Sequence, residues 1–179
     1  MPRSSESRED RFTTLYARHF DAVRAYAWRR GPDEADDVVA ETFLVAWRRL
    51  DQVPVESLPW LFAVARNVRC NMERGERRRR LREERGAPAA AGATPAAILE
   101  ERSAVRSALA QLSESDREVL MLAAWEQLDR AGMAAALGCS RTAVTVRLFR
   151  ARRRLAAALS EAETRPAVAT VAQGELDEC

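Results

Sequence analysis

The chain contains no lysine, because all 29 of its basic residues are arginine. This absence excludes any mechanism that depends on a catalytic, Schiff-base or phosphate-loop lysine. His19 is the single histidine, it has no second ligand at helical spacing, and no glycine-rich loop is present. The sequence therefore lacks the acid–base and metal-ligand groupings on which most enzymes depend. We predict a protein that is not an enzyme, needs no cofactor and binds no metal, with His19 in a packing or surface role.

Cysteines and long apolar segments are also scarce. Cys70, Cys139 and Cys179 are far apart and odd in number, which leaves neither a disulfide framework nor a Cys-X-X-Cys metal site. No apolar run approaches the roughly 18 residues that a membrane span needs. Residues 1–11 are polar and lack the hydrophobic segment of a signal peptide. We therefore expect a cytoplasmic protein that does not associate with a membrane.

What the chain does have is helical periodicity. Hydrophobic residues make up 47% of it, enough for a packed core, and they recur at intervals of three and four rather than alternating. This pattern predicts an all-α fold with two helical domains joined by a flexible linker, the second domain containing a helix-turn-helix. The predicted divisions are an N-terminal extension (residues 1–11), a first domain (12–85), a linker (86–97), a second domain (98–159) and an acidic, mobile tail (160–179).

The linker is identified by its composition. Residues 86–97 are almost wholly alanine, proline, glycine and threonine. Twelve extended residues span at most about 40 Å, so this segment could hold two domains on separate sites without fixing their orientation. Further along, Ser115-Asp116-Arg117-Glu118 predicts a capping box that opens a helix, with Ser115 at the N-cap and Glu118 at N3.

The strongest local pattern is a helix-turn-helix over residues 128–155. Asp129 can cap a short helix, Gly138 can end it in the left-handed conformation, and Ser140 can cap the longer helix that follows. The inward face of the longer helix is predicted to consist of Val144, Leu148, Ala151 and Leu155.

The opposite face of this longer helix is basic. Residues 141–154 include six arginines and no acidic residue. A helix with such a face can enter the major groove of DNA, where arginine reads guanine and an apolar side chain contacts the thymine methyl group. The alternative is a solvated basic helix in an ordinary bundle. The predicted DNA contacts are Arg141, Thr142, Thr145, Val146, Phe149, Arg150 and Arg153.

A second basic segment lies in the first domain. Residues 66–85 hold nine arginines against four glutamates, and Trp60, Asn67, Asn71 and Arg74 share one helical face. An aromatic ring, amides and a guanidinium along one face suit single-stranded bases, through stacking, hydrogen bonds and phosphate neutralisation. Taken alone, this pattern is also consistent with a core tryptophan and a solvated helix end.

A third feature is acidic. Five carboxylates gather where the second helix is expected to begin, a position that the helix dipole favours. Capping explains two or three of them, and the full set indicates a surface for a basic protein partner, although simple helix-start chemistry remains the alternative. These residues are Asp33, Glu34, Asp36, Asp37 and Glu41.

Together these motifs resemble a known family. Residues 12–19, EADDVVAETF at 34–43 and WLFAVARN at 60–67 resemble region 2 of bacterial sigma factors. AQL at 110–112, REVL at 117–120 and the segment 137–152 resemble region 4. The chain is similar to the extracytoplasmic-function (ECF) branch of the sigma-70 family, which keeps only these two regions. The resemblance covers about residues 12–158, in the expected order and with the expected linker.

The resemblance implies a function and partners. Such a protein binds the clamp helices and the flap of core RNA polymerase. It reads promoter DNA as a duplex at the −35 element and as a single strand at the −10 element. The implied polymerase contacts are Asp36, Asp37, Glu41 and Leu44. The implied −10 and melting contacts are Asp51, Gln52, Ser57, Trp60, Arg66, Asn67, Asn71 and Arg74, with residues 51–57 as the pocket for a flipped base. An anti-sigma factor is a further partner that the resemblance allows.

Other classes explain less of the sequence. A helix-turn-helix regulator that is not a sigma factor accounts for the second domain alone. A response regulator needs alternating strands and helices and a lysine, and this chain has neither. An all-helical enzyme needs an acid–base or metal-binding group of residues, which the sequence does not offer. A helical adaptor explains the acidic surface but neither basic face, and DNA binding that weakens steeply with salt would distinguish it from a sigma factor.

Overall fold

The computed structural model describes residues 7–83 and 100–164, which form helices and contain no strand. In chain order the elements are α1 (Arg8–Trp28), η1 (Pro32–Glu34), α2 (Ala35–Arg48), η2 (Leu50–Gln52), α3 (Ser57–Glu83), α4 (Glu100–Gln111), α5 (Glu114–Ala124), α6 (Arg130–Leu137) and α7 (Arg141–Thr164). The predicted all-α class is confirmed. The predicted linker at 86–97 lies outside the described residues, as does most of the predicted tail.

The first three helices pack around one apolar core. Helix α1 contacts α2 and α3, and α2 contacts α3. Val23, Phe43 and Leu61 are buried and come one from each helix, and burying a side chain of this size contributes roughly 1.5–3 kcal/mol. The ring of Tyr26 in α1 stacks on that of Phe62 in α3, with centroids 4.8 Å apart. This packing sets the orientation of the two helices that carry the predicted polymerase and −10 faces.

Helix α1 begins inside the segment predicted as an N-terminal extension. The Ser7 hydroxyl accepts a hydrogen bond from the Asp10 amide at 3.0 Å, and the Asp10 carboxylate accepts one from the Ser7 amide at 3.2 Å. This capping box satisfies two amides that the helix start would leave unpaired. Arg8 and Arg11 then pair with Asp51 at 3.6 and 3.1 Å, so the first turn of α1 is tied to the turn before α3.

In the second half of the chain, α7 is the central element. It contacts α4, α5 and α6. Val144, Leu148 and Ala151 are buried and Leu155 is partly buried, which confirms the predicted inward face. Helix α7 continues to Thr164, so the segment predicted as a tail from residue 160 begins as helix. No helix in the described ranges is long and apolar enough to cross a membrane.

The capping box predicted at the start of α5 is wrong. The N-cap residue is Ser113, whose hydroxyl accepts a hydrogen bond from the Asp116 amide at 3.2 Å. Ser115 lies inside the first turn, and Glu118 lies buried further along the helix. Both Ser113 and Ser115 are followed three residues later by a carboxylate, so the local pattern allows two registers. Burial of Glu118 against the first half of the chain selects the earlier one.

The three caps predicted for the helix-turn-helix are confirmed. Asp129 accepts a hydrogen bond from the Gly132 amide at 2.7 Å, and the Ser140 hydroxyl accepts one from the Ala143 amide at 3.1 Å. Gly138 ends α6 in the left-handed conformation, with φ 64° and ψ 38°. These contacts set the sharp turn that projects α7 away from α6.

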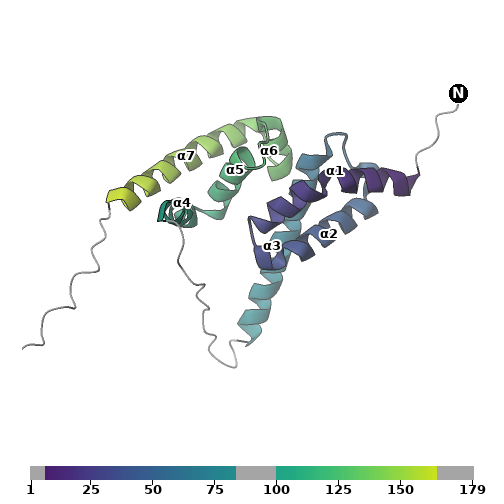
Figure 1. The fold of residues 1–179 in the computed structure, drawn as a ribbon, viewed down its shortest axis with the longest axis horizontal. Helices are drawn as coiled ribbons and strands as arrows, with labels where there is room; N and C mark the ends of the chain where they lie inside the picture. Colours follow the sequence, from purple (N-terminus) through teal and green to yellow (C-terminus); the bar gives the residue numbers. More distant parts are fainter. Residues whose placement is uncertain (1–6, 84–99, 165–179) are drawn as a thin grey trace, which may run out of the picture.

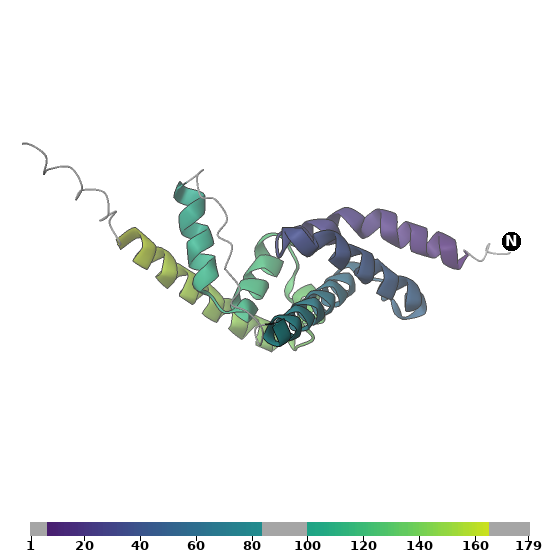
Figure 2. The ribbon, with the colours of Figure 1, turned by 90° about the horizontal axis from the view of Figure 1, so that it is seen from below.

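The two halves touch each other. Figures 1 and 2 show α1–α3 on one side and α4–α7 on the other, with α6 against α3. A Cβ on Gly132 of α6 would lie 3.4 Å from Pro59 of α3, and one apolar cluster includes buried residues of both halves. The composition of the linker gave no reason to expect a fixed orientation, and these contacts between the halves supply one.

We predict opposite effects of alanine at two glycines. At Gly138, Gly138→Ala should lower the free energy of unfolding by about 1–2 kcal/mol, because a Cβ strains the left-handed conformation. At Gly75, in the exposed interior of α3, Gly75→Ala should raise it by about 0.5–1 kcal/mol, because alanine loses less conformational freedom. A Cβ would meet no atom within 4 Å at either position, so the pair isolates the backbone effect. Chemical denaturation measures both values, and changes of the same sign would contradict the prediction.

Candidate nucleic-acid and polymerase interfaces

The face of α7 opposite its core contacts is exposed to solvent. Phe149 and Val146 are 62% and 43% exposed, unusual for large apolar side chains, and they share this face with arginines. The Thr145 hydroxyl donates a hydrogen bond to the Arg141 carbonyl at 3.0 Å. All seven predicted −35 residues are exposed in the structure: Arg141, Thr142, Thr145, Val146, Phe149, Arg150 and Arg153. The surface is therefore chemically able to contact both phosphates and base edges.

Only some of the side chains predicted to form the −10 face on α3 are exposed. Asn67, Asn71 and Arg74 are exposed, whereas Trp60 and Arg66 are half-buried. Trp60 packs against the apolar core, so its ring lies at the boundary between core and surface. The exposed amides and guanidinium can reach a strand of nucleic acid directly, whereas the Trp60 ring is only partly accessible for stacking.

The turn before α3 holds the remaining −10 candidates in three different environments. Asp51 is exposed but paired with the arginines of the first turn of α1. Gln52 is exposed. Ser57 is buried, and its hydroxyl lies 2.8 Å from Nε2 of His19. His19 thus has a polar partner within the core, and the Ser57 hydroxyl does not face solvent in this structure.

The acidic face of α2 borders an apolar groove. Asp36, Asp37, Glu41 and Leu44 are all exposed, as the predicted polymerase contacts require. Asp36 and Leu44 also line a groove of about 490 Å³ between α1 and α2. The other lining residues are Phe12, Tyr16, Phe20, Val39, Ala40, Phe43 and Trp47. The surface therefore combines carboxylates with an apolar depression, which suits a helix that carries both basic and apolar side chains.

Sequence reasoning missed this groove because helical periodicity does not distinguish an aromatic stripe in a closed core from one that lines an open depression. Tyr16 is 39% exposed, and its ring lies 4.7 Å from that of Phe43. Phe12 contacts Trp47 with centroids 5.2 Å apart. The aromatic side chains thus line an open depression rather than a closed interior. The concentration of Phe12, Tyr16 and Phe20 on one stripe of the helix is the sequence feature that could have indicated such a groove.

Charged residues at the junction of the two halves were also missed. Tyr26 and Arg30 contact Glu118, and both Arg29 and Arg30 contact Glu126. No local pattern distinguishes these residues from ordinary surface charges, since their partners lie some 90 positions away in the sequence.

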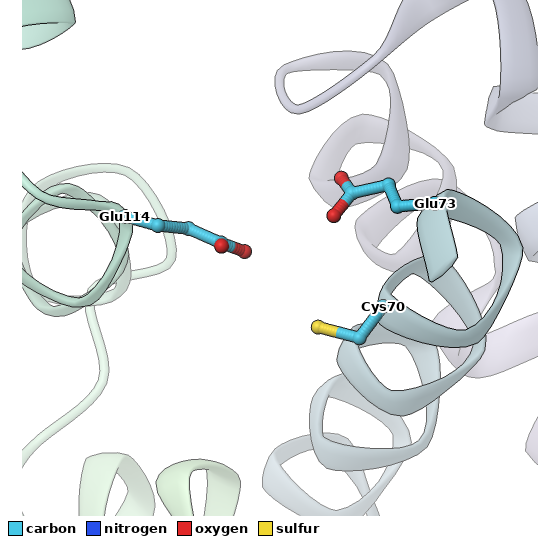
Figure 3. Close-up of side chains that lie close together, drawn as sticks. All are labelled: Cys70, Glu73 and Glu114. Atoms are coloured by element: carbon cyan, nitrogen blue, oxygen red, sulfur yellow. The ribbon is translucent and has the colours of Figure 1, made fainter. Parts of the chain in front are cut away.

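A further junction lies beside Cys70. Figure 3 shows Glu114 of α5 directed across a gap toward Cys70 and Glu73 of α3, and the ligand atoms of the three lie within 4.8 Å of one another. Arg69 pairs with Glu73 and, at 2.5 Å, with Glu114. This hydrogen bond holds the pKa of the Glu114 carboxyl below its usual value. Because Arg69 already supplies the compensating positive charge, we interpret the cluster as an ionic contact between the halves rather than a metal site.

Comparison with known proteins assigns the two halves. The family description "Sigma-70 region 2" matches residues 15–80, and "Sigma-70, region 4" matches residues 102–155. These matches cover the first helical unit and the helix-turn-helix unit respectively. The class defined by the fold is therefore that of a sigma factor with regions 2 and 4.

Relatives narrow this class. The ECF RNA polymerase sigma factor SigL of Mycobacterium tuberculosis is 32% identical over 82% of this chain and 88% of its own length. CnrH of Cupriavidus metallidurans, an RNA polymerase sigma factor, is 34% identical over 83% of this chain and 86% of its own. A probable sigma factor of Xanthomonas campestris, RfaY, is 34% identical, but the chain spans only 34% of that protein.

Solved structures agree with this result. The sigma factor RpoE from Bartonella quintana, in complex with the anti-sigma factor NepR, has a TM-score of 0.65 and 27% identity, covering 83% of this chain and 96% of that one. CnrH in complex with the cytosolic domain of CnrY has a TM-score of 0.61 and 32% identity, covering 88% and 92%. The chain belongs to the ECF family of RNA polymerase sigma factors.

The buried His19, in contact with Ser57, should make the free energy of unfolding depend on pH. Burial, together with the nearby charge of Arg18, holds the pKa of His19 below 6.5. The imidazole of the unfolded chain therefore binds a proton at a higher pH than that of the folded chain. The contribution of neutral His19 to the free energy of unfolding is fully present above about pH 6.5 and is lost as the pH falls below that value. We expect urea denaturation to show this loss between about pH 7 and pH 5. His19→Gln should remove that part of the slope, and an unchanged slope in the variant would refute the assignment.

Proposed function

We propose that this ECF sigma factor uses three separate faces: the outer face of α7 for the −35 duplex, the α3 face for the −10 strand, and the acidic face of α2 for core polymerase. The observation that carries the proposal is the exposure of all seven predicted residues on α7, on a helix start that carries six arginines and no acid over residues 141–154. The role is one of binding and positioning rather than catalysis. It places the protein in the cytoplasm with polymerase and chromosome.

The −35 assignment is supported by how α7 is held. Its N-terminus is capped by Ser140 and its inner face is buried, so the outer face is presented rigidly. In helix-turn-helix proteins the N-terminal residues of the second helix contact base edges. Arg141 and Thr142 occupy those positions here, and Arg150 and Arg153 lie further along, where they suit the phosphate backbone.

The −10 assignment is supported by the exposed polar groups of α3. Asn67 and Asn71 are one helical turn apart and Arg74 follows in the next turn, all on the solvent side. Amides can pair with the edges of unstacked bases, and the guanidinium can neutralise the backbone. A contact between Ser57 and a DNA base would require the Ser57 hydroxyl to give up its hydrogen bond with His19. Of the residues in the proposed pocket, Ser57 would therefore need the largest rearrangement.

The polymerase assignment is supported by the combination of charge and groove on α2. Asp37 and Glu41 are one turn apart and exposed, beside the depression lined by Leu44. A basic helix with apolar side chains would satisfy both. The solved structure of RpoE is a complex with the anti-sigma factor NepR, and we include an anti-sigma factor among the proposed partners of this chain.

Run-off transcription with purified core polymerase tests the function as a whole. The full chain should direct initiation at a defined set of promoters, and mapping their start sites gives the −10 and −35 sequences. Core polymerase alone is the control. Failure to direct any initiation from genomic fragments would exclude the proposed role.

The α7 assignment predicts a specific change in DNA binding. Arg150→Ala should weaken binding to a −35 duplex. If the guanidinium contacts phosphate, the slope of log affinity against log salt should fall by about 0.9 for all sequences. If it reads a base, preference at one position should relax by about 1–3 kcal/mol. Arg106→Ala, an exposed charge loss on α4, is the matched control. Equal affinities of both variants and the parent protein would remove Arg150 from the interface.

The α2 assignment predicts loss of polymerase binding without loss of fold. Asp37→Arg combined with Glu41→Arg places like charges across the proposed interface, at a cost of several kcal/mol. Exposed charge reversals change stability by less than about 0.5 kcal/mol each. The control is Asp21→Arg with Glu161→Arg, an equal charge change at exposed positions elsewhere. Co-purification with core polymerase and circular dichroism measure the outcome, and wild-type affinity in the folded α2 variant would contradict the assignment.

A further inference from the structure

The chain segment between α2 and α3 is attached to α1 at its first end by two arginines. Arg11 Nη1 lies 3.1 Å from the Asp51 carboxylate, and Arg11 Nη2 donates to the Leu50 carbonyl at 3.4 Å. Arg8 lies 3.6 Å from Asp51 and donates to the Trp47 carbonyl at 2.7 Å. These carbonyls lie at or just beyond the C-terminal end of α2, where a helix leaves acceptors unpaired and its dipole favours positive charge. The first turn of α1 therefore fixes the point at which the segment leaves α2.

The second end of the segment is attached inside the core. Ser57 is the first residue of α3, and its hydroxyl lies 2.8 Å from His19 Nε2. Both residues are 7% exposed, so separating them would leave two buried polar groups without partners, which is costly. The Ser57 amide also donates to the Val55 carbonyl at 3.0 Å. The backbone that enters α3 therefore has one defined position relative to α1.

Between these attachments the segment is open to solvent. Its exposed residues are Gln52, Pro54, Val55 and Glu56. Figure 1 shows the chain between α2 and α3 beside α1. The attachment points on α1, Arg11 and His19, are about 12 Å apart at 1.5 Å per residue, whereas the chain from Asp51 to Ser57 could extend to about 20 Å. The segment therefore has slack that the attachments at its ends restrain, and Val55 is 96% exposed.

We propose that α1 positions the pocket for a flipped −10 base. Three of its side chains hold the two ends of segment 52–56, so that this segment meets the DNA strand in one arrangement. Asp51 and Ser57 serve as the attachment points, and the base contacts the exposed segment between them. This role rests on the proposed function, because it lies within the proposed −10 pocket. The positioning residues are Arg8, Arg11 and His19.

Fixed ends matter because a base is recognised by groups held within hydrogen-bond distance of its edge. Gln52 carries an exposed amide that can donate and accept, and Val55 carries an exposed apolar side chain. A segment released at either end loses backbone freedom when the base binds, and that loss of entropy opposes binding. The exposed amides of Asn67 and Asn71 lie further along α3 and continue to hold the strand. Loosening the segment should therefore reduce discrimination between bases more than it reduces binding of the strand.

The principal test compares two replacements of His19 in the polymerase holoenzyme. His19→Leu has a similar volume but no hydrogen-bonding group, whereas the His19→Gln amide can donate to the Ser57 hydroxyl. Run-off transcription from promoters with each of the four bases at every −10 position measures base preference. At one position, the preference for the best over the worst base should fall about tenfold in His19→Leu and stay near the parent value in His19→Gln. Equal losses in both variants would assign the effect to packing and overturn the proposed attachment.

A second pair of variants tests the exposed attachment and leaves the core unchanged. Arg8→Met with Arg11→Met removes both ion pairs to Asp51 while keeping long side chains. The control is Arg18→Met with Arg24→Met, an equal loss of charge at exposed positions of the same helix. Circular dichroism should match the parent protein for both. Base preference should fall about three- to tenfold in the first variant, at the −10 position that the buried attachment affects, and should not change in the control.

The −35 positions separate a positioning role from a general loss of stability. Preference at these positions is assigned to α7, so it should be the same in all variants. A uniform fall at both elements would overturn the positioning role, as would an unchanged −10 preference in the folded variants. Failure of the parent protein to direct initiation at any promoter would instead refute the proposed function. Normal initiation by the parent protein, combined with either of the first two results, refutes the positioning role alone.

Discussion

The guanidinium of Arg30 holds the relative placement of the two halves of this chain. It follows the last turn of α1, its side chain is 3% exposed, and it contacts Tyr26, Glu118 and Glu126. A buried charge that loses its partners costs about 3–5 kcal/mol. As long as the halves are joined, Glu118 of α5 and Glu126 of the segment after it must therefore stay beside the Arg30 guanidinium. The position of α5 in turn determines where α6 and α7 lie.

The α7 and α2 faces that we propose for the −35 duplex and for polymerase lie outside this junction. The outer side of α7 and the acidic side of α2 carry exposed residues, whereas the surfaces that meet are those of α3, α5 and α6 and the end of α1. Each half also has buried apolar side chains of its own, such as Phe43 in the first and Val144 in the second. The architecture therefore separates the contacts that stabilise each region from those that place the regions together.

The polar interior of region 2 shows the same separation on a smaller scale. His19 and Ser57 satisfy each other between α1 and the start of α3, while Arg8 and Arg11 hold Asp51 at the surface. The turn that precedes α3 is thus attached to α1 at one buried and one exposed point. A strand of DNA that entered this turn would compete with both attachments.

Local patterns in the sequence were enough to predict the helices, their caps around the helix-turn-helix and the inward face of α7, because periodicity and capping depend on residues three or four positions apart. The exposure predicted for Arg141, Phe149, Asp37 and Glu41 is also found in the structure. Four features became visible only in three dimensions: the cap at Ser113, the open groove beside Tyr16, the burial of Ser57 and the pairing of Arg30 with Glu118. Each of these depends on a contact between residues distant in the chain, whose energy comes from shared burial and charge compensation that no local pattern records.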